Sequence, residues 1–153
     1  MLSCYLGNFL PKVLCKFLNL GIISDSTFNR VTNLYTAPAI EKWWGKMQNV
    51  ILSLLNHKEV ILAGDGRNDS PGHSSTYCQY TFMDTFSDLI VHQELIDVRD
   101  AQLKSPNMEK IGFQKGLDFL MNQMNVEGVV TDSHSSISAL LGKNPSMFCF
   151  CFT

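Results

Sequence analysis

The sequence predicts an α/β fold in which a mixed β-sheet follows a small helical lobe. The spacing of apolar residues changes from helical to extended after Lys58. Two short apolar runs, residues 60–63 and 129–131, are each followed closely by an aspartate, Asp65 and Asp132. Continuous apolar runs of this length are typical of strands that are buried on both faces. The pattern therefore predicts two buried strands that each carry a carboxylate near the end.

The front of the chain is expected to consist of three helices. Apolar residues recur every three or four positions over residues 9–18, and a second helix is expected after a cap at Ser24 or Asp25. Pro38 suits the first turn of a third helix that runs to Leu55. Two interpretations remain open. The helices either pack on the rest of the chain, or they form a helix-turn-helix that binds DNA.

The rear of the chain predicts a sheet with one helical crossover. The expected elements are strands over residues 60–63, 77–82 and 89–96, a helix from Pro106 to Met124 capped by Ser105, a strand over 126–131, and a helix from Ser133 or Ser135 to Leu141. Strands joined by short links pair antiparallel, whereas a crossover helix returns the chain to a parallel strand. If the fourth strand lies beside the first, Asp65 and Asp132 are neighbours at the edge where open α/β sheets bind ligands.

We expect three segments: a helical lobe over residues 1–58, a partial α/β domain over 59–144 and an atypical tail over 145–153. The tail has no acidic residue, and its phenylalanines at positions 148, 150 and 152 alternate as in a strand. An uncovered fourth strand would present an edge that invites self-association. We therefore predict that the tail pairs with that edge as a substitute strand.

Composition limits the classes of protein that the chain can represent. The net charge of −2 is unevenly distributed. Residues 1–58 contain six basic and two acidic residues, whereas residues 59–153 contain six basic and twelve acidic residues. A basic front suits phosphate and an acidic rear suits cations, but neither half has the dense basic patch of a strong nucleic-acid binder. Five cysteines without C-x-x-C spacing indicate reduced thiols inside the cell. No run reaches the roughly 20 uncharged residues that a membrane span needs, so no membrane partner is expected.

Four segments together resemble one known family. They are residues 64–73, which read Gly-Asp-Gly-Arg-Asn-Asp-Ser-Pro-Gly-His, then 77–84, then 105–112 around Met108 and Glu109, and then 130–134. In this order they resemble the ribonuclease H-like fold, and within it the DDE/DDD transposase-like proteins. The similarity extends from about Leu18 to Leu141.

The resemblance implies a metal-dependent site that acts on DNA. In such enzymes, three carboxylates hold two divalent ions about 3.5–4 Å apart at the scissile phosphate. Asp65 would be the first carboxylate and Asp132 the second, with Asp69 as an outer contact to the metal. Arg67 and His134 would contact phosphate. The implied ion is Mg²⁺ or Mn²⁺, the partner is DNA, and the location is the nucleus.

The family's third carboxylate lies beyond the segment that matches Leu141, where this chain continues into a tail without acidic residues. We therefore expect a transposase-derived chain that is truncated before its third carboxylate. Such a chain would hold an ion weakly, would lack strand-transfer and nuclease activity, and would serve as a nucleic-acid or protein interaction module. The family's DNA-binding region would precede residue 1.

Several alternatives remain open for these residues. Asp65 and Gly66 could form an ordinary turn, Asp132 could cap the helix after it, and His73 and His134 could be solvated loop residues. The motif G-D-G-x-N-D over residues 64–69 also resembles the magnesium loop of haloacid dehalogenase-type phosphatases. Those enzymes need an aspartate nucleophile earlier in the chain, and no such acidic pair precedes residue 64. A β-hairpin directly after Gly72 would count against the phosphatase.

Overall fold

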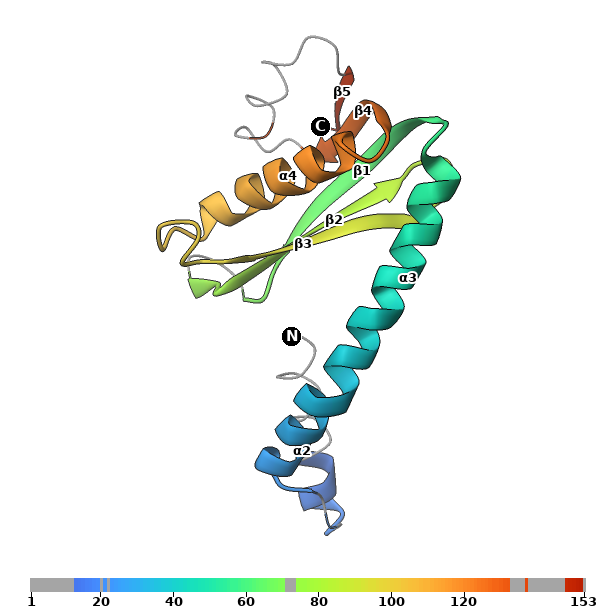
Figure 1. The fold of residues 1–153 in the computed structure, drawn as a ribbon. Helices are drawn as coiled ribbons and strands as arrows, with labels where there is room; N and C mark the ends of the chain where they lie inside the picture. Colours follow the sequence, from blue (N-terminus) through green and yellow to red (C-terminus); the bar gives the residue numbers. More distant parts are fainter. Residues whose placement is uncertain are drawn as a thin grey trace. The chain divides into compact units, whose positions relative to one another are not determined.

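A computed structural model describes residues 13–19, 21, 23–70, 74–132, 137 and 148–152. Its contacts divide the chain into two compact units, residues 1–47 and 48–153. Figure 1 shows the helices of the first unit in blue and cyan and the sheet of the second in green to red. The predicted α/β class and mixed sheet are confirmed. No helix among the described residues combines the length and apolarity that crossing a membrane requires.

The first unit is mainly helical in the part that the structure describes. Residues 13–17 form a short helix, which confirms the described part of the first predicted helix. Helix α2 (Asp25–Val31) begins after Ser24, whose hydroxyl oxygen accepts a hydrogen bond of 3.2 Å from the Thr27 amide. Ser24 is therefore the N-cap, as one of the two predicted candidates, because its side chain satisfies an amide that the helix itself leaves unpaired.

A π-helical turn replaces the predicted break before the third helix. Helix α2 continues through η1 (Thr32–Thr36) directly into α3 (Ala37–Leu55). The Ala37 amide donates to the Thr32 carbonyl five residues earlier, which is the π-helical bond. A regular α-helix would bring the ring of Pro38 against the carbonyl of Leu34, and the wider turn relieves that clash. The expected break between the second and third helices is therefore wrong, and these two helices do not form a helix-turn-helix.

The second unit contains a five-stranded sheet in the order β3-β2-β1-β4-β5. The strands are β1 (Glu59–Asn68), β2 (Tyr77–Asp84), β3 (Ile90–Asp97), β4 (Asn125–Asp132) and β5 (Phe148–Phe152). β1, β2 and β3 pair antiparallel, and β4 lies parallel to β1 after the crossover through α4 (Pro106–Met121). Both the antiparallel set and the parallel fourth strand were predicted, and both are confirmed.

The tail forms the fifth strand. β5 pairs parallel with β4 from Gly128 opposite Phe148 to Asp132 opposite Phe152. The prediction of a substitute strand on the edge of β4 is confirmed. The helix predicted over residues 133–141 lies outside the described residues except for Ile137, which is helical and buried.

The core lies between α4 and one face of the sheet (Figure 1). The rings of Tyr80, Phe82 and Phe113 are fully buried and contact one another with centroids 4.9 to 6.0 Å apart. The last turns of α3 belong to the same unit. Ile51 and Leu55 join the core, and the Gln48 side chain hydrogen-bonds to the Val91 carbonyl (3.1 Å). Aromatic contacts of this kind add to the free energy that the buried area already provides.

The start of α4 differs from the prediction in one respect. Pro106 stands at the first turn, as predicted, but Ser105 is not a side-chain cap. Ser105 already has helical backbone angles, and its carbonyl, rather than its hydroxyl, accepts from the Met108 amide (3.1 Å). An N-cap residue normally adopts extended angles, which let its hydroxyl reach back to the helix. The Ser105 hydroxyl is instead buried without a hydrogen-bond partner.

We predict that Gly116→Ala destabilises the second unit. A Cβ at Gly116 would overlap the Phe82 ring and would lie 3.2 Å from the His92 ring. Overpacking of a core costs roughly 1–3 kcal/mol, which outweighs the gain in helix propensity of about 1 kcal/mol. Urea unfolding should show a lower midpoint for this variant.

Gly45→Ala is the matched control, because a Cβ at this helical position meets nothing within 4 Å. This variant should keep or raise the midpoint, since alanine favours the helix by roughly 1 kcal/mol. Equal destabilisation by the two substitutions would contradict the packing of α4 on Phe82.

Candidate functional site

Asp65 and Asp132 are neighbours in register. The parallel ladder of β1 and β4 pairs Leu62 with Val129 and Gly64 with Thr131, so the next residues on the two strands are Asp65 and Asp132. Both aspartates are exposed. The predicted adjacency of the two residues along the β1–β4 ladder is confirmed, whereas the role of their carboxylates as metal ligands stays a prediction.

Asp65 lies inside a strand and not in a turn. β1 continues to Asn68, and Asp65 is paired with Thr81 of β2. The two glycines that flank Asp65 serve close packing. A Cβ at Gly64 would lie 2.8 Å from the Tyr80 hydroxyl oxygen, and a Cβ at Gly66 would lie 2.5 Å from the Glu109 Cγ. The alternative of an ordinary turn at Asp65 is therefore wrong, because these glycines admit side chains from β2 and α4.

Strand alternation determines the sheet face that each site residue occupies. Gly64 and Gly66 lie beneath Tyr80 and Glu109, on the face that α4 covers. Successive residues of a strand point to opposite faces, so Asp65 projects from the other face. Arg67 is exposed two residues further along β1 and shares the face of Asp65. A guanidinium beside a carboxylate edge is suited to contact a phosphate that an ion also holds.

Asp69 closes the loop between β1 and β2. Its Oδ1 accepts from the Ser75 hydroxyl (2.6 Å) and from the Thr76 amide (3.0 Å), and its own amide donates to the Tyr77 carbonyl (3.0 Å). The Ser75 hydrogen bond is the main cause that lowers the pKa of Asp69 below its usual value. These bonds favour the charged carboxylate and give Asp69 a structural role at this position.

His134 and His73 lie outside the described residues, as does the segment that Asp132 would cap except for Ile137. Their predicted roles in phosphate contact, in a solvated loop or in helix capping therefore remain predictions. In the described part of the chain, no three side chains of the types His, Cys, Asp and Glu gather closely enough to hold a metal ion.

Glu109 is a further acidic residue at this edge that the sequence reasoning did not assign to the site. It stands in the first turn of α4 and packs over Gly66. Burial is the main cause that raises the pKa of Tyr80, and the charges of Glu109, Asp132 and Asp65 raise it further. These three carboxylates therefore act electrostatically on one buried hydroxyl, which also lies 3.4 Å from the Thr131 hydroxyl.

The order and direction of the strands could have predicted the position of Glu109. β3 runs parallel to β1, because each of them is antiparallel to β2. The helix that follows β3 must therefore start at the edge where β1 and β4 end. An acidic residue in the first turn of that helix, where the helix dipole also favours negative charge, is expected at the same edge as Asp65, on the face that α4 covers.

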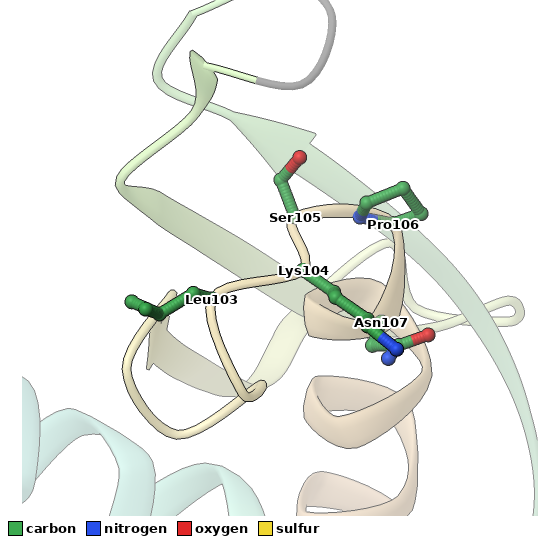
Figure 2. Close-up of a pocket in the computed structure, with 5 residues that line it drawn as sticks. All are labelled: Leu103, Lys104, Ser105, Pro106 and Asn107. Atoms are coloured by element: carbon green, nitrogen blue, oxygen red, sulfur yellow. The ribbon is translucent and has the colours of Figure 1, made fainter.

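A small pocket lies at the start of α4. The residues that line it are distant in sequence from Asp65 and Asp132. Its lining consists of Leu103, Lys104, Ser105, Pro106 and Asn107, and Figure 2 shows the Leu103 and Ser105 side chains pointing in different directions. Gln102 and Leu103 both have left-handed backbone angles, with φ of 55° and 59°. None of the predicted site residues lines this pocket.

Protein-family models, curated proteins and solved structures were all compared with the chain, and none of them matches it. Function is therefore inferred from the geometry of the site.

We predict that the Asp69 carboxyl titrates with a pKa below that of an ordinary aspartate, and that Ser75→Ala moves its midpoint back up. A pKa that is lower in the folded state stabilises the loop above the unfolded pKa. This contribution is lost as the pH falls through the folded value. A titration followed by carboxyl ¹³C NMR measures both midpoints. Identical midpoints in the wild type and Ser75→Ala would contradict the assigned role of the hydrogen bond.

Proposed function

We propose that this chain is a transposase-derived protein with a ribonuclease H-like core that binds nucleic acid without transferring strands. The observation that carries the proposal is the parallel register of β1 and β4, which sets Asp65 beside Asp132. The order of three antiparallel strands, a crossover helix and a parallel fourth strand supports the same fold. The motif around Asp65 supports the transposase-like branch.

The chemistry of the site suits an ion that bridges protein and phosphate. Mg²⁺ is usually held by one or two carboxylates together with phosphate oxygens, and it keeps several of its waters. Asp65 and Asp132 supply two carboxylates on an exposed edge. Solvent competes strongly there, so the ion is bound weakly until a phosphate completes its coordination. Arg67, on the same face as Asp65, would contact that phosphate.

The two alternative functions receive less support from the local structure. β2 and β3 form an antiparallel hairpin after Gly72, where the phosphatase interpretation does not expect one. The hairpin turn is tied by the Asp84 carboxylate, which accepts from the Ser87 amide (3.0 Å). For the helix-turn-helix alternative, α2, η1 and α3 follow one another without a turn, and the break that remains lies between the helix over residues 13–17 and α2. The carboxylate edge is therefore the best-supported site.

We predict that Asp65→Asn and Asp132→Asn each weaken metal-dependent binding of DNA. Fluorescence anisotropy with single-stranded and duplex oligonucleotides should show binding in Mn²⁺ or Mg²⁺ that decreases in EDTA. Each variant should lose on the order of tenfold in affinity, about 1.4 kcal/mol. Asp118→Asn is the matched control, because Asp118 is exposed on α4 beyond its first turn.

Equal affinity in EDTA and in Mn²⁺, unchanged by Asp65→Asn, would contradict the proposed site. A nicking assay with supercoiled plasmid tests the remaining part of the proposal. We expect no nicking with either ion. Metal-dependent nicking that Asp65→Asn abolishes would contradict the claim of binding without cleavage.

A further inference from the structure

The first unit carries an apolar stripe on its helices. The stripe consists of Val31, Tyr35, Ile40, Trp43 and Met47, which are 43%, 70%, 58%, 61% and 39% exposed. Large apolar side chains that are exposed singly are ordinary, but a continuous row of them marks an interaction surface. No residue of this row is charged, so the surface does not suit the phosphates of a nucleic acid.

The spacing of the stripe is that of a coiled-coil seam. Ile40, Trp43 and Met47 are separated by three and four residues, which is the spacing of the a and d positions in a heptad repeat. Phe28, which is partly buried, leads to Val31 and Tyr35 with the same spacing. In sequence, the repeat continues after Met47 to residues 50 and 54.

The π-helical turn keeps the two halves of the repeat on one face. Ile40 follows Tyr35 by five positions, whereas neighbours on one face of an α-helix are three or four positions apart. The turn η1 lies between α2 and α3 at this point, and its bond from Ala37 to Thr32 spans five residues. A π-helical turn accommodates one residue more than an α-helical turn. The extra residue in the sequence and the extra residue in the turn therefore cancel.

We propose that this stripe is the surface through which two copies of the chain associate. A row of a and d residues is self-complementary, since each side chain fits between four residues of the facing helix. Tyr35 and Trp43 are residue types that commonly anchor such contacts. The proposal is independent of the proposed function and of the carboxylate edge.

The exposed area of the stripe is compatible with the interface of a homodimer. The exposed parts of the five stripe residues amount to about 500 Å² per copy, taking about 150–250 Å² for each aromatic side chain. A standard interface buries about 800 Å² per partner, and about 65% of a homodimer interface is apolar. The stripe therefore supplies roughly the apolar area that one side of a stable dimer needs.

Sedimentation velocity of the full chain from low to high micromolar concentration tests this proposal. The wild type should sediment as a dimer that dissociates on dilution, and Trp43→Ser should raise the dissociation constant at least about tenfold. Phe86→Ser is the matched control, because Phe86 is an aromatic residue with 93% exposure in the turn between β2 and β3. Its dissociation constant should stay that of the wild type.

Ile40→Asp provides a second variant, and circular dichroism verifies that each variant keeps the helical content of the wild type. A dimer that weakens in Trp43→Ser and Ile40→Asp, but not in Phe86→Ser, supports the proposal. A wild type that stays monomeric would overturn it. A dimer that both stripe variants leave unchanged would also overturn it, and would point to association through the edge of the sheet.

Discussion

The parallel pairing of β1 with β4 is the constraint on which the site depends. It brings together two aspartates that are remote in sequence, Asp65 and Asp132, and it requires the crossover through α4. The crossover is stable because α4 buries its apolar side against Tyr80, Phe82 and their neighbours. Weaker packing of α4 would loosen the register of β4, and the two aspartates would no longer be held side by side.

Most of the fold was predictable from the sequence, because burial imposes a period on each element. The continuous apolar run of β1, the alternation in β2 and the phenylalanines of the tail all identify strands. The order of the elements then gave the parallel fourth strand. The π-helical turn at η1 was not predictable in this way, because a proline such as Pro38 usually indicates the first turn of a new helix. The clash that a regular helix would create there decides the outcome.

The site was predictable only in part, and its glycines explain why. The pattern Gly64-Asp65-Gly66 predicts a turn when it is considered alone, because glycine and aspartate are common in turns. Their actual role depends on side chains from other elements, Tyr80 and Glu109, whose approach no local pattern reveals. Glu109 was missed for the same reason. The resemblance implied that Asp69 is an outer contact to the metal, but its hydrogen bonds to Ser75 and Thr76 hold it in the loop.

Paramagnetic broadening by Mn²⁺ tests the central claim most directly, because it reports which residues lie beside a bound ion. In a titration of the full chain followed by NMR, the amide signals of Asp65 and Asp132 should broaden together at the lowest Mn²⁺ concentrations. The signal of Asp118, on the far part of α4, should persist. Broadening of only one of the two aspartates, or broadening that starts elsewhere, would contradict a shared site at the edge of β1 and β4.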